Sequence, residues 1–379
     1  MLDRRHLRNL DWGLFIAVLM LMAISVTMVS SATRQTPVGG DPFYYTKKQV
    51  VWVIIGLAVM VVAVMTDYLS LARLSNLIYF GCVGLLLAVM VPGLGHKALG
   101  AQRWIPLGFM QLQPSEVAKI GIIITFANYL RSRERKIERL RDYIGPFLHI
   151  GIPLGLIMMQ PDLGTSLVFI AVTFGMLYIS GAPGIHIASM GLGGLSLASL
   201  AVYLHESIGL PIFLKDYQIA RLTSFINPKA DPLGTGYHLI QSIIAIGSGG
   251  FIGKGLFEGT QNLLKFLPIR HTDFIFSVIG EELGFLGTAF VLALYFFIVY
   301  RSIRIAASAR DLFGSLIATG IVAMFIFHIL TNIGMTTGIM PVTGIPLPLM
   351  SYGGTSMLIN CLAIGMLEGI HMRRQKILF

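Results

Sequence analysis

Long apolar stretches recur along the whole chain and are separated by shorter polar segments. A helix needs roughly 20 apolar residues to cross a hydrocarbon core of roughly 30 Å, and these stretches have about that length. The interior of a bilayer offers no water to unpaired backbone groups, so each stretch is predicted to be a helix. The pattern therefore predicts an all-α polytopic membrane protein before any motif is considered.

About ten transmembrane helices are predicted from length and hydropathy. They lie near residues 12–30, 50–66, 76–91, 114–130, 143–159, 163–179, 185–204, 276–300, 312–334 and 355–370. We expect residues 1–379 to form one integral membrane domain. Small residues between Gly191 and Ser199 give the seventh span a small face, which favours close packing against another helix.

Lys and Arg residues gather near residues 4–8, 131–141, 301–310 and 373–376. With ten spans these four clusters fall on one side of the membrane, and the positive-inside rule makes that side the cytoplasm. Both termini are then cytoplasmic, and a bacterial cytoplasmic (inner) membrane is the expected location. Membrane topology explains most of the formal charge of +10, so no nucleic-acid partner is expected.

Three predicted external segments are too irregular to be plain turns, near residues 92–113, 205–275 and 339–354. The longest lies between the seventh and eighth spans. It contains apolar pieces at 208–214 and 239–246 that are too short to span a bilayer. Interfacial or re-entrant helices are therefore expected in this loop.

The stretch 271–276, His-Thr-Asp-Phe-Ile-Phe, together with Glu281 and Glu282, places a histidine and three carboxylates at the outer end of the eighth span. Asp273 is suited to act as a general base, a role typically worth about 10²–10⁴-fold in rate. Carboxylates here are equally suited to bind Mg²⁺ or Mn²⁺, which prefer oxygen ligands. For Glu281 and Glu282, stabilisation of the positive end of a helix dipole is an equal alternative.

Charged residues inside a membrane are costly, so each one needs an explanation. Glu116 and Lys119 share a helix face, where they form either a local ion pair or a polar wall facing a cavity. Asp162 precedes an apolar run and is either a helix cap or a substrate contact. His328 and Asn332 share a face of the ninth span, which favours a polar contact between helices.

The long external loop is rich in cations and in glycine. A basic surface beside a carboxylate suits a substrate that carries phosphate, although attraction to anionic headgroups is the alternative. The glycines between 247 and 255 allow close backbone approach to a ligand but do not match a phosphate-binding P-loop. The cations are Lys215, Arg221, Lys229, Lys254, Lys265 and Arg270.

Five motifs in order resemble the SEDS family of shape, elongation, division and sporulation proteins. They are residues 100–105, 113–116, 160–165, 271–276 with 280–282, and 351–354. Together they cover essentially the whole chain. The stretches 236–250 and 259–268 resemble the elongation branch, while Ile269 stands where the family often has Glu.

This resemblance implies a ten-helix peptidoglycan glycosyltransferase that uses lipid II during cell elongation. It implies a class B penicillin-binding transpeptidase and the rod elongation complex as partners. A divalent cation, Mg²⁺ or Mn²⁺, is an expectation from the family, since the sequence has no metal-binding spacing of its own. The family further implies that Asp273 is essential and that Trp104 is functionally important.

The resulting hypothesis makes Asp273 the general base for attack by an acceptor hydroxyl on lipid-linked sugar. Cations would stabilise the leaving pyrophosphate. A lipid II flippase or transporter, and a non-catalytic scaffold of the elongation complex, are the competing functions. The expected substrate-binding residues are Arg103, Trp104, Glu116, Lys119, Asp162, Arg221, Lys254, His271 and Ser351.

Overall fold

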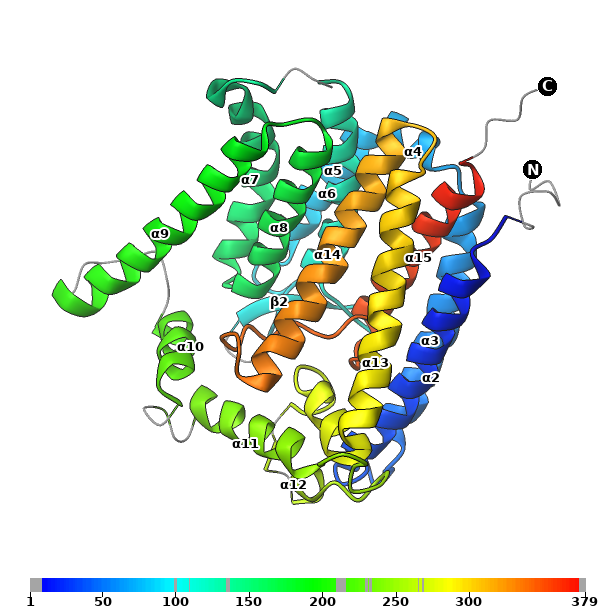
Figure 1. Ribbon diagram of the computed structural model, residues 1–379, viewed down its shortest axis with the longest axis vertical. Helices are drawn as coiled ribbons and strands as arrows, with labels where there is room; N and C mark the ends of the chain where they lie inside the picture. The colour runs from blue at the N-terminus through cyan, green and yellow to red at the C-terminus, as the bar shows by residue number, and fades with distance from the viewer. Residues whose placement is uncertain are drawn as a thin grey trace.

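The computed structural model describes residues 9–98, 101–108, 110–133, 137–208, 216–228, 231, 234–264, 266–267 and 269–374. They form an elongated helical bundle in which the first and last described residues lie at the same end (Figure 1). This end also carries the basic segments after α6 and α13 and is called the basic end. The predicted all-α polytopic fold is confirmed.

Seven described helices are long and apolar enough to cross a membrane. They are α2 (Trp12–Thr33), α3 (Tyr44–Met65), α7 (Ile144–Met159) with the preceding turn η1 (Leu140–Tyr143), α9 (Gly184–Ile208), α13 (Ile275–Ala307), α14 (Leu312–Thr337) and α15 (Gly354–Met372). Three more occupy the other predicted spans: α5 (Ser75–Ala88), α6 (Pro114–Arg131) and α8 (Leu163–Ile179). Because α5 and α8 are short and α6 carries charge, the count of ten crossings stays a prediction.

Polar caps fix several helix starts. The side chains of Asp11, Asp162 and Asp311 each accept a hydrogen bond from a backbone N–H of the first turn of α2, α8 and α14. Such caps satisfy donors that a helix leaves unpaired at its start. α14 ends at Gly338, whose φ of 80° is left-handed and suits glycine.

The long external loop folds onto the end of the bundle opposite the termini (Figure 1). It contains α10 (Asp216–Ile226), α11 (Thr235–Ser248) and α12 (Thr260–Leu263), while α4 (Tyr68–Arg73) is a short helix at the basic end. The apolar piece at 239–246 lies within α11, as expected for a non-spanning helix. The piece at 208–214 lies outside the described residues except for Ile208, which ends α9.

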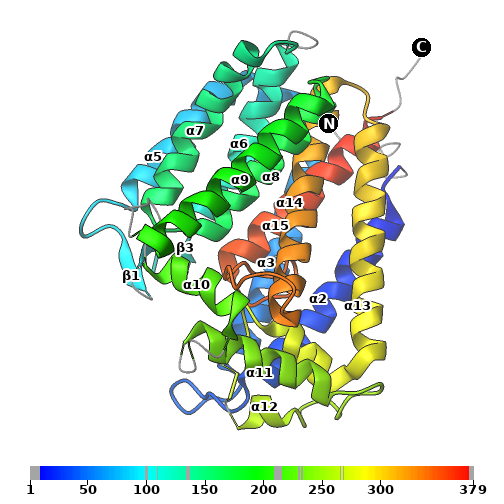
Figure 2. The same cartoon turned by 60° about the vertical axis from the view of Figure 1, so that its left-hand side comes forward.

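The external segment near 92–113 is more regular than its sequence suggested. It forms a three-stranded antiparallel sheet of β1 (His96–Ala98), β2 (Ala101–Pro106) and β3 (Gln111–Leu112), in the order β1-β2-β3. Ile105 faces Leu112 in the β2–β3 pairing. The sheet leads directly into α6 and brings β2 over the external end of the bundle (Figures 1 and 2).

α13 is broken at Gly284, whose φ of 63° and ψ of −160° are not helical. The glycine-rich segment after α11 pairs with the broken backbone: Lys254 and Gly255 donate to the carbonyls of Glu281 and Glu282, at 3.0 Å each. A Cβ on Gly253 would lie 2.2 Å from the Glu282 carbonyl oxygen. These glycines therefore allow close approach to α13, which corrects the expectation of a ligand.

α9 stands away from the bundle along most of its length (Figure 1). None of its 18-residue apolar window is buried, and Gly191, Gly193 and Gly194 have no atom within contact distance of a Cβ position. The expected close helix packing of its small face is therefore wrong for the described chain. Small residues permit close approach but do not supply a partner.

Candidate functional site

Asp273 lies in the turn that enters α13, at the external end of the bundle. The preceding residue is fixed by Ser351, whose hydroxyl donates to the Thr272 carbonyl oxygen at 2.6 Å and accepts from the backbone N–H of Leu347 at 2.8 Å. The Asn332 amide donates to the carbonyl oxygen of Asp273 itself at 2.9 Å. The carboxylate is thus held by its backbone, and its side chain remains half-buried.

Arg221 of α10 reaches the same place from the long loop. Its guanidinium donates to the Thr343 carbonyl oxygen at 2.7 Å. A Cβ on Gly344 would lie 3.3 Å from Asp273 Oδ2 and 3.7 Å from both terminal nitrogens of Arg221. Gly344, with a φ of 73°, therefore lies between the carboxylate and the cation, and its missing side chain keeps space open there.

Arg103 and Asp162 form a second pair beside Asp273. Arg103 Nη1 lies 3.8 Å from Asp162 Oδ1, and the guanidinium also donates to the carbonyl oxygens of Gln160 and Pro161. Asp162 additionally accepts hydrogen bonds from the backbone N–H and the hydroxyl of Thr165. Asp162 is therefore a helix cap and a partner of Arg103, and its contact with a substrate stays a prediction.

Burial raises the pKa of the Asp273 carboxyl above its ordinary value. A hydrogen bond with Thr272 and the charges of Arg221 and Arg103 oppose this rise in the pKa, and the negative charge of Asp162 adds to it. The geometry links the four groups in two pairs, because Gly344 lies next to both Asp273 and Arg221, and Arg103 lies 3.8 Å from Asp162. The structure thus brings together two carboxylates and two guanidinium groups that are far apart in the sequence.

Glu116 and Lys119 lie deeper, inside the bundle. Lys119 Nζ is 2.7 Å from Glu116 Oε1 and 2.9 Å from His328 Nε2, and both side chains of the ion pair are at most 5% exposed. His328 Nδ1 lies 2.7 Å from the Met324 carbonyl oxygen, so Nε2 is the acceptor for Lys119. This is a buried, satisfied cluster, which favours the ion-pair interpretation of Glu116 and Lys119.

His271 lies in the Asp273 turn itself, whereas Trp104 lies on β2. The ring of His271 contacts the rings of Tyr45 and Tyr352, with centroids 5.0 and 5.6 Å away. Burial, with the nearby Arg270 charge, lowers the pKa of His271 to about 4, so its ring is neutral near pH 7. Trp104 follows Arg103 on β2 and is half-buried, and the β1–β2 register is irregular at this point.

Lys254 lies in a separate cluster. Its ammonium is 2.7 Å from Glu281 Oε1 and 2.7 Å from the Thr260 hydroxyl. Within the part of the chain that the structure describes, no contact joins Lys254 to Asp273, Arg103 or Arg221. The structure therefore does not bring Lys254 to the group of charges around Asp273, although the sequence analysis expected it there.

Sequence reasoning missed the groups that hold this site together. Asn332 was expected only to join helices, but it donates to the carbonyl oxygens of both Asp273 and Ile345, the second at 2.7 Å. Thr343 and Gly344 were part of an external segment without assigned roles. The sequence did offer one indication of their importance. Irregular backbone between α14 and α15 must be shielded by protein or line a polar cavity.

The fold and the charged site define a polytopic membrane protein with a carboxylate and arginines gathered at the external end of its bundle. Residues 11–376 match the family model described as cell cycle protein and named for FtsW, RodA and SpoVE. The chain belongs to this family, the SEDS proteins, as its motifs predicted.

Several curated relatives are similar along nearly their whole length. Stage V sporulation protein E of Bacillus subtilis is 38% identical, with 95% of this chain and 96% of the relative aligned. The probable peptidoglycan glycosyltransferase FtsW of Trichlorobacter lovleyi is 38% identical (96% and 94%). The peptidoglycan glycosyltransferase MrdB of Escherichia coli is 37% identical (97% and 95%).

Solved structures agree with this assignment. RodA of Thermus thermophilus aligns with a TM-score of 0.70 at 30% identity, covering 97% of this chain and 98% of that one. A chain from a peptidoglycan synthase complex that couples polymerization and crosslinking aligns with a TM-score of 0.78 at 32% identity, covering 96% and 98%. The likeness therefore extends over the whole fold.

Proposed function

We propose that the protein is a peptidoglycan glycosyltransferase that joins lipid II units on the external face of the membrane, with Asp273 as general base. The observation that carries this proposal is the gathering of Asp273, Arg221, Arg103 and Asp162 at the external end of the bundle. The names of the curated relatives support the reaction class.

In the proposed reaction the Asp273 carboxylate accepts the proton of the 4-hydroxyl of the acceptor GlcNAc. The freed oxygen attacks C1 of the donor MurNAc, and the new C1–O bond forms with inversion. The bond from C1 to the pyrophosphate oxygen breaks, and undecaprenyl pyrophosphate leaves with the electron pair. A raised pKa suits a carboxylate to this task, because it makes the ionised group a stronger base.

Arg221 and Arg103 are the cations suited to stabilise the leaving pyrophosphate. Guanidinium groups bind phosphate oxygens in a bidentate manner, and fixed donors aimed at developing charge lower the barrier. Both arginines are anchored through backbone carbonyls, which holds their orientation. Lys119 is sequestered with Glu116 and His328, so its proposed role is to hold α6 against α14 rather than to contact the substrate.

A divalent cation is a further expectation. Among the described residues no group of three or more His, Cys, Asp or Glu side chains has the arrangement to hold a metal ion. The oxygens of Asp162 are already engaged by Thr165 and Arg103. The donor set therefore does not form a metal site by itself, and lipid II assays with and without chelator test the cation dependence.

The proposed partners are a class B penicillin-binding transpeptidase and the other members of the rod elongation complex. The likeness to a chain of a synthase complex that couples polymerization with crosslinking supports a crosslinking partner. The likeness to RodA and MrdB supports the elongation role, and the bacterial inner membrane is the proposed location. Co-purification with the cognate transpeptidase tests the first of these points.

The purified protein with lipid II in vesicles distinguishes the competing functions. We expect glycan polymer from the wild type and none from Asp273→Ala. Transbilayer movement of lipid II without polymer would instead favour a flippase or transporter. Transpeptidase binding in Asp273→Ala together with normal cell growth would favour a non-catalytic scaffold.

A further inference from the structure

A polar cavity of about 410 Å³ lies between α5, α6 and α7 at the basic end. α6 begins next to Asp162 through Ser115, and at about 1.5 Å per residue its cavity-lining residues Thr125 and Arg131 lie about 15 and about 24 Å along the helix from Ser115. Figure 2 shows the three helices side by side as they approach this end. The cavity is therefore separate from the site described above. Its lining includes Ser75, Asn76, Thr125, Asn128, Arg131 and His149.

Several of these polar groups have no hydrogen-bond partner among the described residues. Ser75 is only 6% exposed, yet among the described residues its hydroxyl makes no hydrogen bond. Within the same described part, the side-chain amides of Asn76 and Asn128 also make none. Thr125 and His149 at the back of the cavity pair with each other at 3.1 Å. Asn76 is exposed and Asn128 is half-buried, so these groups line an open cavity and are available to a ligand with hydrogen-bonding oxygens.

The charge of the cavity favours an anion. Its lining contains Arg131 and no carboxylate among the described residues. Arg131 is exposed and its guanidinium lies 5.9 Å from the Phe313 ring centre, which leaves its donors available. Ser75 begins α5, so the positive end of that helix dipole also faces this region. Arginine, hydroxyl and amide donors together are suited to phosphate.

The surroundings of the cavity are apolar and open. On α5, Leu77 and Phe80 are each 71% exposed, and on α7, Leu148 is 62% exposed. These side chains lie on helices that the fold places in the membrane, so hydrocarbon chains are expected to cover them. A phosphate attached to such chains would satisfy the polar cavity and the apolar rim together. Membrane lipid covers these side chains in either case, so the apolar rim favours a lipid phosphate because such a lipid already lies beside the cavity.

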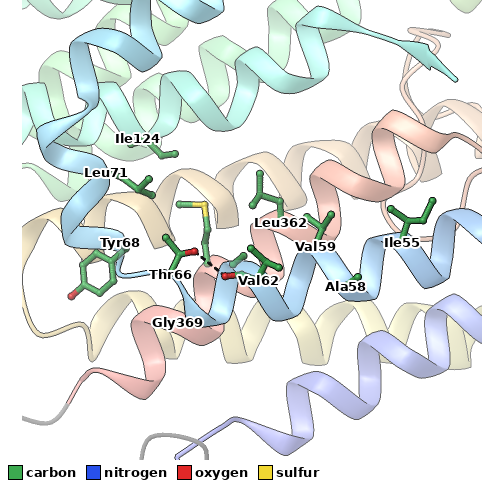
Figure 3. Close-up of a pocket in the computed structure, with 12 residues that line it drawn as sticks. Ile55, Ala58, Val59, Val62, Thr66, Tyr68, Leu71, Ile124, Leu362 and Gly369 are labelled. Atoms are coloured by element: carbon green, nitrogen blue, oxygen red, sulfur yellow. Dashed lines mark hydrogen bonds between the residues drawn. The ribbon is translucent and has the colours of Figure 1, made fainter. Parts of the chain in front are cut away.

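A neighbouring groove on the other side of α6 differs from this polar cavity in its apolar lining. It encloses about 450 Å³ between α3, α6 and α15 and is lined almost wholly by apolar side chains such as Val59 and Leu362 (Figure 3). Its one hydroxyl outside Tyr68, that of Thr66, already donates to the Val62 carbonyl oxygen at 2.8 Å. That groove offers contact to a hydrocarbon chain but does not orient a headgroup.

We propose that the cavity between α5, α6 and α7 binds the phosphate-bearing headgroup of an anionic membrane lipid from the leaflet on the basic side. Arg131 contacts the phosphate, while Ser75 and Asn128 hydrogen-bond to headgroup oxygens. The bound lipid fastens α5 to α6 and α7. The site is independent of the glycosyl transfer proposed above.

The test uses the full-length protein purified in detergent and titrated with phosphatidylglycerol or phosphatidylcholine, with binding measured by native mass spectrometry. We expect phosphatidylglycerol to bind more tightly, and Arg131→Gln and Asn128→Leu each to weaken it by about fivefold or more. Arg304→Gln is the matched control, because Arg304 is also exposed near the basic end and also lies 5.9 Å from an aromatic ring.

Equal weakening by Arg131→Gln and Arg304→Gln would overturn the proposal, because it would show attraction to surface charge alone. Binding of both lipids with equal affinity would also overturn it. Soluble glycerol phosphate that displaces the lipid at equal concentration would show a soluble ligand instead. Because Asn128 makes no hydrogen bond in the described chain, a lipid-free melting temperature of Asn128→Leu near that of the wild type separates lost binding from misfolding.

Discussion

At the scale of single residues, opposite influences act on the Asp273 carboxyl. Burial raises its pKa, whereas the guanidinium groups of Arg221 and Arg103 lower it. A carboxylate in this setting binds a proton more readily than an exposed one. The two arginines are therefore expected both to lower the pKa of the base and to stabilise the proposed leaving pyrophosphate.

The pH dependence of polymerisation follows from these influences. Only the ionised carboxylate accepts a proton, so kcat/KM should fall as the pH drops through the raised pKa of Asp273, at a higher pH than the ordinary 3.8. Arg221→Gln removes a charge that lowers this pKa, so the acidic limb should move to higher pH. Lys254→Gln, which lies in another cluster, should leave the limb in place.

Initial rates of lipid II polymerisation between pH 4 and pH 9 check this prediction. His271, with its pKa lowered to about 4, is not expected to contribute to the limb above about pH 5. An acidic limb of the pH–rate profile that stays unchanged in Arg221→Gln would show that Arg221 does not affect the pKa of the general base.

Asn332 is a positioning residue rather than a catalytic one. Asn332→Leu leaves the buried carbonyl oxygens of Asp273 and Ile345 without their donor, at a cost of about 1–3 kcal/mol for each. We expect a lower melting temperature and at least a tenfold loss of kcat. Asn360→Leu removes a single hydrogen bond within α15 and should have the smaller effect. Equal effects of the two variants on kcat would contradict the positioning role.

At the scale of elements, the break in α13 depends on the glycines that pack against it. Gly253 has a φ of 90°, and a Cβ there would lie 2.2 Å from the Glu282 carbonyl oxygen. Gly253→Ala should therefore lower the free energy of unfolding by more than about 2 kcal/mol. Gly247 in α11 has open space around it, so Gly247→Ala should be neutral or stabilising by about 0.5–1 kcal/mol.

Thermal unfolding of both glycine variants in the same detergent gives the comparison. Equal melting temperatures would show that the pairing between the loop and α13 contributes little to stability.

The helices were predictable because the bilayer imposes their length. All ten predicted spans coincide with described helices, and the span at 163–179 matches α8 (Leu163–Ile179) residue for residue. The break at Gly284 and the sheet of β1, β2 and β3 were not predicted. The break depends on pairing with residues 250–255 of the preceding loop, whereas the sheet depends on pairing between neighbouring strands, and hydropathy reports neither kind of pairing.

The site was predictable only in part for a related reason. Motifs and charge identified Asp273, Arg103, Asp162 and Arg221, which the fold does bring together. They could not show that Lys254 pairs with Glu281, because the nearest carboxylate depends on how α13 is broken. Asn332 was recognised as polar, but its two carbonyl acceptors lie in segments that only tertiary structure brings near.

At the scale of the whole molecule, the basic segments of the chain and the Asp273 site lie at opposite ends of the bundle. Arg304 and Arg373 belong to the basic end, whereas Asp273 and Asp41 belong to external segments in the predicted topology. The exposed ion pair of Asp41 and Lys47, at 2.7 Å, joins the loop after α2 to the first turn of α3. This arrangement suits an enzyme that takes a lipid-borne substrate from the membrane and builds a product outside it.

Cysteine labelling in cells tests this orientation. A membrane-impermeant maleimide should label Lys47→Cys in intact spheroplasts and should label Arg304→Cys only after the membrane is permeabilised. Both native cysteines, Cys82 and Cys361, are buried, so the background should be low. Labelling of Arg304→Cys in intact spheroplasts would reverse the assignment of the two faces.

The most direct measurement of the central claim is the initial rate of lipid II polymerisation by Asp273→Asn, with Asp41→Asn as the control for the same chemical change on the same side. Both rates are normalised to folded protein. We expect Asp273→Asn to lose at least about 100-fold in rate, because an amide cannot accept the proton, and Asp41→Asn to match the wild type. Polymer formed at the wild-type rate by Asp273→Asn would contradict the role of this carboxylate as the base.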